Sequence, residues 1–368
     1  MASTLKLRVV QARYGDCLIL ESGYGKRKKH ILVDGGPGKV YRPFLRGELQ
    51  RIAQGGWQID LLVLSHIDND HVLGLLELMT ELKGQHQKGQ PWIVPVIRIW
   101  HNAFKKLVPE AGEDADAIEE DLLLTPNVPE GDDPEQPVDF GVGEGVKLNL
   151  ADELLGIPRN SVYNDGMIRL GQRPQPVRLA GIRMWILGPS EKNLSALKTK
   201  WLKWLAARRG EVSFDPEASI RPDDSVNNLS SIMFLAEQGG RRILMTGDGR
   251  SQDIIEGLEA AGLLPPGGTM HVDVMKVPHH GSARNCVGDL FDRVQADVYV
   301  LSADGRHGNP DKETLAWLVD AACRQNRDIE IFATNWTKSL EELLEKRPEG
   351  ANHYRLRVME QGKISDVI

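Results

Sequence analysis

The chain has 368 residues, of which 41% are hydrophobic and 26% charged, and its formal net charge is −7. This is the composition of an ordinary globular protein with a sizeable core. The acidic balance argues against a protein that holds nucleic acid by bulk positive charge, although a local basic patch could still serve a nuclease.

The cysteines and the hydropathy exclude several further classes of protein. The three cysteines, Cys17, Cys286 and Cys323, are odd in number and widely spaced, which excludes a disulfide framework and a thiolate metal clamp. No apolar stretch is long enough for a signal peptide or for a bilayer span. We therefore expect a cytoplasmic protein with no membrane partner.

The first third of the chain alternates short strands with helices. Residues 59–65 form a continuous apolar run, which is typical of a strand buried on both faces. Residues 44–53 and 72–82 show helical spacing of apolar residues. β-Branched content and turn boundaries predict further strands at 6–12, 17–22, 30–36 and 95–102.

The pattern then changes to an acidic, proline-rich stretch. Residues 109–140 contain "PEAGEDADAIEEDLLL" and "PEGDDPEQPVDFG" with little periodicity. We interpret 103–180 as an acidic, irregular insertion or small lobe within one domain of residues 1–368. The insertion is also the expected docking surface for a protein partner, should there be one.

Predicted strands and helices return in the second half of the chain, in an order similar to that of the first half. Two similar β/α halves packed face to face around one site are the expected arrangement. Predicted strands are 181–190, 230–238, 241–249, 271–282, 296–305 and 328–335, and predicted helices are 193–209, 251–262 and 311–324.

Four polar clusters each follow directly on an apolar strand. They are Asp34, the stretch "HIDNDH" at 66–71, Asp248, and the pair His279–His280. Loops at strand ends are where a rigid scaffold presents catalytic groups. Histidine and carboxylate side chains without cysteine suit zinc, manganese or iron, and two hydrolytic metals need about this many ligands.

Each residue also has a structural interpretation without chemistry. Asp70 could cap a helix, which is worth roughly 1 kcal/mol, and Asp248 could cap the helix predicted at 251–262. Asp34 could make a turn, and one of the two histidines could be a buried core imidazole. The ordered set of clusters favours the metal interpretation. His101, which follows a strand, is a weaker candidate.

Four sequence motifs, three of which contain clusters described above, together resemble those of the metallo-β-lactamase fold hydrolases. "HIDNDH" is similar to the HxHxDH signature, with Asp68 in place of the middle histidine, and "TGD" resembles the motif that carries a bridging aspartate. "VPHHGS" and "VNNLSSIMFL" are similar to the hydrolase domain of bacterial DNA-uptake (ComEC-like) channels and to phosphorylcholine esterases. The resemblance implies a four-layer αββα fold, with two mixed sheets face to face and helices outside.

The resemblance also implies a set of two divalent metal ions, Zn²⁺ or Mn²⁺. His66 and Asp68 would hold the first metal and Asp70 and His71 the second, with Asp248 between them. One of His279 and His280 would complete the second site, and His280 is preferred. His279 would then contact the substrate and could protonate the leaving group, so that Asp70 and His279 are the expected catalytic residues.

Three further residues are expected to contact ligands or substrate without binding metal directly. Asp34 would brace the metal loops. Asn227 stands where many family members have a histidine ligand, and with Asp68 this makes the first site rich in oxygen, which favours manganese. His307 lies two residues from the position of a family histidine, since Asn309 precedes Pro310 here.

The activity expected from this resemblance is hydrolysis of a phosphodiester, as in a phosphodiesterase or nuclease. A hydroxide shared by the two metals would attack phosphorus. The substrate would be nucleic acid, a nucleotide or a similar ester. Two alternatives remain open: hydrolysis of a carboxyl derivative such as a lactone or thioester, and a metal-binding regulatory module without turnover.

Overall fold

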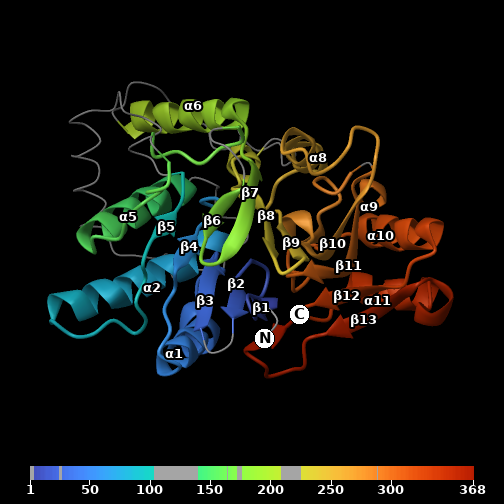
Figure 1. Cartoon of the computed structure of the whole chain (residues 1–368), viewed down its shortest axis with the longest axis horizontal. Coiled ribbons are helices and arrows are strands. Elements are labelled where there is room, and N and C mark those ends of the chain that lie inside the picture. The colour runs from blue at the N-terminus through green and yellow to red at the C-terminus, as the bar shows by residue number, and fades with distance from the viewer. Residues whose placement is uncertain are drawn as a thin grey trace.

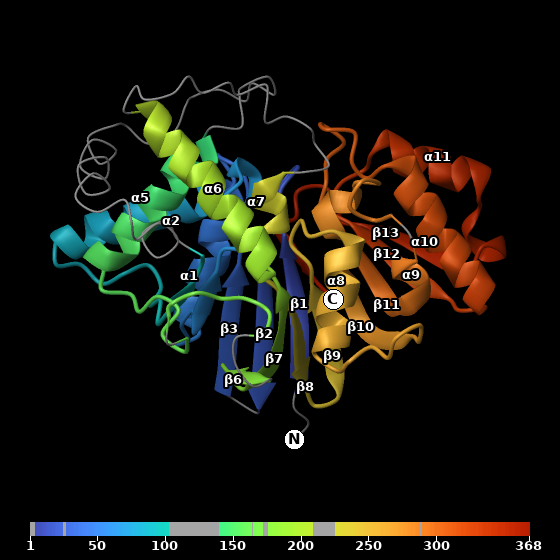
Figure 2. The same ribbon diagram turned by 90° about the horizontal axis from the view of Figure 1, so that it is seen from above.

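The computed structural model describes residues 4–24, 27–102, 140–163, 165–171, 176–208, 225–287 and 289–368. They form two sheets packed face to face, with helices on both outer sides (Figures 1 and 2). The predicted α/β architecture, αββα with two mixed sheets, is therefore confirmed. No helix in the described part of the chain is long and apolar enough to cross a membrane.

The first sheet has six strands and is built mainly from the N-terminal part of the chain. Its first pairings are antiparallel, and the pairings of β3 with β4 and of β4 with β5 are parallel. In spatial order the strands are β14 (Ser365–Val367), β1 (Thr4–Val10), β2 (Leu18–Tyr24), β3 (Arg27–Val33), β4 (Leu61–Val63) and β5 (Ile99–Trp100).

The second sheet has eight strands and repeats this plan. The pairings from β6 to β9 are antiparallel, and those from β9 to β13 are parallel. In spatial order the strands are β13 (Tyr354–Val358), β12 (Ile329–Ala333), β11 (Val294–Leu301), β10 (Met270–Lys276), β9 (Arg241–Met245), β8 (Met233–Gln238), β7 (Ile182–Gly188) and β6 (Val177–Leu179).

Side-chain alternation along the strands builds the layers. In β1, Leu5, Leu7 and Val9 point into the core between the sheets, whereas Val10 joins the core under the outer helices. This is the period-two alternation of a strand with one buried face, since Thr4 and Lys6 on the other face are exposed and only its last residue is buried there. Phe234 of β8 and Phe332 of β12 enter the inter-sheet core from the opposite side.

Two helical layers cover the outer faces, and Figure 1 shows them on opposite sides of the molecule. Over the first sheet, buried apolar residues of four helices share one core: α1 (Arg46–Gln54), α2 (Asn69–Gln87), α5 (Phe140–Leu154) and α6 (Glu191–Arg208). Over the second sheet the corresponding helices are α8 (Ser251–Ala260), α9 (Leu290–Arg293), α10 (Lys312–Gln325) and α11 (Lys338–Lys346).

Several predicted strands are shorter than their apolar runs. The prediction of 59–65 reduces to β4 and that of 95–102 to β5, and the flanking residues keep only isolated pairings, such as the parallel bridge between Ile59 and Val96. The strand predicted at 271–282 ends at Lys276, since Pro278 and the left-handed backbone of the next residues turn the chain. Apolar runs therefore located the strands better than they bounded them.

The acidic insertion is described only in part. Residues 103–139 lie outside the described residues, and with them most of the predicted partner surface. Residues 140–154 form α5, which packs on α2, and 177–179 form β6. The glycines of "FGVGEGVKLNLADEL" are poor helix formers, so packing against α2 rather than propensity accounts for this helix.

Helix α2 approaches the loop after β3 so closely that only glycine fits. A Cβ built on Gly74 would lie 1.9 Å from the carbonyl oxygen of Gly35. We expect Gly74→Ala to lower the free energy of unfolding by about 1–3 kcal/mol through overpacking. Gly84→Ala on the same helix is the control: nothing lies within 4 Å of its Cβ position, and it should raise stability by roughly 0.5–1 kcal/mol. Urea unfolding compares the two, and equal effects would contradict this account.

A buried carboxyl group on α5 predicts a pH dependence of stability. Burial raises the pKa of Glu144 to about 7, and its Oε2 has no hydrogen-bond partner among the described residues. The folded chain thus keeps a proton that the unfolded chain releases near pH 4.5. The free energy of unfolding should therefore fall as the pH rises from about 4.5 to 7. We expect Glu144→Gln to abolish this decline and to stabilise the protein at pH 8 by up to about 3 kcal/mol. Denaturant unfolding at pH 4 and 8 measures both arms, and a variant equal to wild type at pH 8 would contradict the prediction.

Candidate metal centre

The four polar clusters predicted from the sequence meet where the two sheets adjoin. Asp34 follows β3 and the 66–71 stretch follows β4 in the first sheet, whereas Asp248 follows β9 and His279–His280 follow β10 in the second. All four strands belong to the parallel parts of their sheets, whose carboxyl ends lie at one edge. Each half of the chain thus supplies part of one buried centre.

Asp34 braces the loop that carries the first histidines. Its carboxylate accepts hydrogen bonds from the backbone N–H and the hydroxyl of Ser65, both at 2.7 Å. It also bonds His71 Nδ1 at 2.9 Å. Because Asp34 holds a proton on Nδ1, the Nε2 atom of His71 faces the centre and is the atom that could bind a metal once it is deprotonated.

A turn of left-handed backbone presents the two histidines of the second half. His279 and His280 have φ values of 46° and 54°, and Gly281 follows at 90°. Such conformations cost non-glycine residues of order 1–3 kcal/mol each and persist only where the surroundings impose them. The His280 ring is held by the carbonyl oxygen of Ser302, 2.9 Å from Nδ1, which leaves Nε2 pointing at the carboxylates.

Asp70, His71, Asp248 and His280 form the tightest group. One ligand atom from each lies within 4.8 Å of all the others. Asp248 Oδ2 is 3.4 Å from His71 Nε2 and 3.5 Å from His280 Nε2, and His280 Nε2 is 3.1 Å from Asp70 Oδ2. These are the spacings of ligands around a single ion, and the group can hold a divalent cation.

Two more predicted ligands, His66 and Asp68, adjoin this group, and His66 approaches the same carboxylate oxygen of Asp248. His66 Nε2 lies 3.8 Å from Asp248 Oδ2 and 3.6 Å from Asp68 Oδ2. The His66 ring is oriented by Ser65, whose hydroxyl is 3.0 Å from Nδ1. Asp248 therefore stands between two sets of potential ligands.

The buried donor atoms fit a metal. Among the described residues, His66 Nε2, His71 Nε2 and Asp248 Oδ1 have no hydrogen-bond partner, although buried polar atoms are nearly always paired. Imidazole and carboxylate suit zinc, manganese and iron. A cation among these atoms would satisfy all three.

The charges of the cluster support the same interpretation. Burial lowers the pKa values of His71 and His280, but Asp248 and the neighbouring carboxylates outweigh it and raise both well above the ordinary value. Burial raises the pKa of Asp248, but the same histidines hold it well below its usual range. The site thus favours positive charge among its carboxylates, and a bound cation would replace the protons on the imidazoles.

Asn227 contacts a potential ligand rather than the centre of the cluster. It lies on α7 (Val226–Leu229), and its Nδ2 donates to Asp68 Oδ1 at 2.5 Å. The amide oxygen faces Lys200 Nζ at 3.4 Å. Asn227 therefore positions Asp68 and turns its own oxygen away from it.

His279 and His307 occupy the solvent side of the centre. The Nδ1 atom of His279 bonds Asn285 Oδ1 at 2.8 Å, and its Nε2 lies 3.7 Å from Asp248 Oδ2. His307 is exposed and meets the ring of Tyr14 edge-on, with centroids 5.2 Å apart. Both histidines line a small cavity of about 60 Å³ together with Asp70 and His280.

The helix-cap alternatives considered for Asp70 and Asp248 do not describe their positions. Asp70 is the second residue of α2, whose N-cap is Asp68. The N-cap of α8 is Arg250 rather than Asp248. His101 lies apart from the cluster and bonds Asp152 at 2.8 Å in a buried network with Arg159. His101 is thus a structural residue.

Two buried residues at the centre were missed in the sequence. Asp16 Oδ2 forms an ion pair with Lys276 Nζ at 2.7 Å, and Asp16 Oδ1 lies 3.4 Å from His280 Nδ1. Both side chains of the ion pair are about 1% exposed. The signals were present: Lys276 is a charge inside the apolar run "VDVMKVP", and Asp16 ends the turn "YGD" between two strands.

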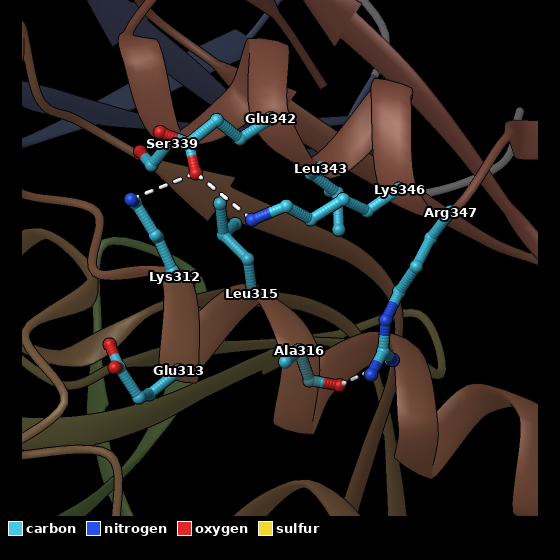
Figure 3. Close-up of a pocket in the computed structure, with 9 residues that line it drawn as sticks. All are labelled: Lys312, Glu313, Leu315, Ala316, Ser339, Glu342, Leu343, Lys346 and Arg347. Atoms are coloured by element: carbon cyan, nitrogen blue, oxygen red, sulfur yellow. Dashed lines mark hydrogen bonds and ion pairs between the residues drawn. The ribbon is translucent and has the colours of Figure 1, made fainter.

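A larger cavity of about 270 Å³ lies between α10 and α11. Figure 3 shows Lys312 and Lys346 both reaching Glu342, while Arg347 reaches the carbonyl oxygen of Ala316. None of its lining residues belongs to the metal-binding cluster. The size of a cavity therefore does not identify the site in this fold.

Comparison with known proteins finds a family model that spans the first ligand motif. Residues 11–151 match the family model described as "Metallo-beta-lactamase superfamily". No curated protein matches the chain. Among solved structures, the metallo-β-lactamase fold protein YhfI from Bacillus subtilis aligns over 99% of both chains with 11% identity and a TM-score of 0.40. The metallo-β-lactamase SMB-1, bound to 2-mercaptoethanesulfonate, aligns over 75% of this chain and 81% of its own with 13% identity and a TM-score of 0.26.

Proposed function

This chain has the metallo-β-lactamase fold with a buried His/Asp cluster, and from that premise we propose that it is a dinuclear metal-dependent hydrolase of phosphodiesters. The observation that carries the proposal is the position of Asp248. Its Oδ2 atom lies 3.4–3.8 Å from Nε2 of four imidazoles, which come from both halves of the chain. One carboxylate shared by two ligand sets is the arrangement that a two-metal site requires.

Two sets of residues would hold the metals. Asp70, His71 and His280 would share one ion with Asp248, and His66 and Asp68 would share the other with the same carboxylate. When bound, two divalent cations would lower the pKa of a shared water and offset charge on the phosphate oxygens. No serine or cysteine nucleophile is needed for such a hydrolysis.

The other side chains would orient the ligands and move a proton. Asp34 and Ser302 fix the tautomers of His71 and His280, so that each Nε2 is left as a donor atom for metal. Asn285 fixes the proton of His279 on Nδ1. The Nε2 atom of His279 lies at the edge of the cavity. It would take a proton from the attacking water and then give this proton to the leaving oxygen.

We prefer phosphodiesters as the substrate class because of the HxDxDH and HHGS motifs. The fold itself does not decide, since it hosts many chemistries. The deciding experiment is hydrolysis of bis(p-nitrophenyl) phosphate by the full chain with added Mn²⁺ or Zn²⁺, compared with Asp70→Ala. Turnover that depends on metal and is lost in the variant supports the proposal. Turnover of lactones or thioesters alone would favour the carboxyl alternative, and metal binding without any turnover would favour a regulatory module.

The oxygen-rich first site predicts a metal preference. Asp68 stands in place of a histidine, and Asn227 turns its amide nitrogen rather than its oxygen toward Asp68. The preference therefore rests on Asp68 alone, whose oxygen lies 3.6 Å from His66 Nε2, and we expect Mn²⁺ to support turnover at least as well as Zn²⁺. Asp68→His should move the ratio of the two rates toward Zn²⁺. Rates at matched metal occupancy measure this, and full activity with Zn²⁺ but none with Mn²⁺ would contradict it.

A further inference from the structure

A lysine of the outer helical layer reaches the first set of metal ligands. Lys200 lies on α6, and its Nζ is 3.4 Å from Oδ1 of Asn227. The Nδ2 atom of Asn227 donates to Asp68 Oδ1 at 2.5 Å, and Asp68 Oδ2 lies 3.6 Å from His66 Nε2. A single amide side chain therefore separates the ammonium group from the ligands of the first metal.

The chemistry of the three side chains fixes the direction of this chain of contacts. A lysine ammonium can only donate hydrogen bonds, and an ionised carboxylate can only accept them. An amide between them satisfies both only when its oxygen faces Lys200 and its nitrogen faces Asp68. Asn227 is fully buried, and its backbone carbonyl accepts the hydroxyl of Ser230 at 2.6 Å. The amide therefore gives the ammonium a defined place beside the centre.

Helix α6 is a firm support for Lys200. Its residues Leu197 and Trp201 are buried in the core over the first sheet, and Figure 2 shows α6 running beside α7. Lys200 precedes Trp201 in the chain and is half-buried. Side chains on a packed helix are held more precisely than side chains on a loop, so the position of Lys200 suits a binding site.

The charge of Lys200 lacks a counter-ion of its own. Among the described residues it forms no ion pair, and its one hydrogen-bond partner is the neutral oxygen of Asn227. The charge of Asp68, on the far side of the amide, would be neutralised by a cation at the first site. The ammonium and that cation would then repel each other. An anion bound between the two removes this repulsion, so the arrangement favours an anionic ligand.

The accessible part of the centre adjoins this lysine. The side chains of Asp68, Asp70 and His279 are 22%, 23% and 26% exposed, whereas that of His66 is enclosed. A substrate must therefore approach the ligands from the face that these three side chains share. Since Asp68 is tied through one amide to Lys200, an anion at that face comes near the ammonium as well as the metal ligands.

We propose that Lys200 binds a non-bridging phosphate oxygen of the substrate at the first metal. This rests on the proposed function for the position of the phosphate. It specifies a substrate that carries negative charge before the reaction, as a phosphodiester does and the carbonyl group of a lactone or thioester does not. Lys200 is thus a substrate-binding residue, and Asn227 positions it.

Two dissociation constants of the full chain, both from isothermal titration calorimetry, test the proposal without requiring turnover. One is for Mn²⁺ alone, and the other is for inorganic phosphate at saturating Mn²⁺. We expect Lys200→Met to weaken phosphate binding about tenfold, the loss expected for one charge-assisted hydrogen bond. The affinity for Mn²⁺ should stay equal or increase, because a repelling charge has been removed.

The Mn²⁺ measurement separates substrate binding from a merely structural role. If Lys200 served only to orient Asn227, and through it Asp68, then Lys200→Met would weaken the binding of Mn²⁺. Lys200→Gln is a second neutral variant with the same expected result. Lys200→Arg keeps the positive charge and should retain most of the phosphate affinity.

Lys192→Met is the control for bulk charge. Lys192 is an exposed lysine in the first turn of α6, so its loss changes the net charge equally and should leave phosphate binding as in wild type. The proposal is overturned if wild type binds no phosphate at saturating Mn²⁺ or Zn²⁺, or if both neutral Lys200 variants bind phosphate as tightly as wild type. It is also overturned if these variants lose Mn²⁺ affinity, or if Lys192→Met weakens phosphate binding as much as they do. Phosphate binding that depends on Lys200, in a protein that hydrolyses no phosphodiester with either metal, supports the anion site and refutes the proposed function.

Discussion

Asp248→Asn should reduce metal-dependent phosphodiester hydrolysis by about 10³-fold, since the loss of several kcal/mol of metal-derived stabilisation corresponds to this factor. The asparagine has the same size and shape but carries no negative charge, and only its single amide oxygen could coordinate metal. In the protein the carboxylate is about 2% exposed and adjoins four imidazoles. The variant should therefore also bind less metal, and it should lack the rise in melting temperature that we expect added Mn²⁺ to give the wild type.

Asp328→Asn is the matched control for this prediction. The Asp328 side chain is 92% exposed and, among the described residues, forms an ion pair only with His353, so activity and metal content should equal those of wild type. Elemental analysis of the purified proteins, with rates at saturating metal, gives both readouts. An Asp248→Asn protein that keeps two metals and turnover within tenfold of wild type would remove Asp248 from the centre of the mechanism.

Lys276→Met should lower the free energy of unfolding by about 3–5 kcal/mol, the usual cost of removing one partner from a buried ion pair. Lys276 and Asp16 are both fully enclosed and their charged atoms lie 2.7 Å apart. Burial lowers the pKa of Lys276, but Asp16 outweighs it and raises the pKa above its ordinary value. In the variant the Asp16 carboxylate keeps its burial and loses its main counter-charge.

A double-mutant cycle separates this ion pair from simple loss of packing. Methionine fills nearly the same volume as the lysine stem, so a packing effect alone should be small. The variant Lys276→Met with Asp16→Asn should recover much of the stability lost in Lys276→Met, because no buried charge is then left alone. Chemical denaturation of the four proteins measures the coupling. Additive effects of the two substitutions would show that the pair is not coupled.

Much of the centre could be predicted because its residues stand out in the linear sequence. Asp34, the 66–71 stretch, Asp248 and the histidine pair each interrupt an apolar strand, and charge at the end of a buried strand is costly without a purpose. The same reasoning located both sheets, since runs such as 59–65 and 230–238 are strongly apolar. Local sequence therefore carries the ligands and the scaffold that presents them.

Other features depend on contacts that no local pattern records. Asp16 and Lys276 are 260 positions apart in the chain, and only the meeting of the two sheets makes them an ion pair. Helix α5 has a glycine-rich sequence and forms against α2. The amide of Asn227 could have faced either way, and Asp68 and Lys200 decide its orientation. In each case tertiary packing overrides local preference.

The division of the ligands between two sheets links metal supply to the lifetime of the folded chain. The group Asp70, His71, Asp248 and His280 is complete only when the halves have docked, so a cation held there would act as a cross-link between segments more than 170 positions apart, from His71 to Asp248. Closing so long a loop is entropically costly, and a ligand that binds the folded chain alone shifts the equilibrium toward it. Starvation for the metal would thus expose the chain to proteolysis, so that its abundance would follow the cell's free metal concentration.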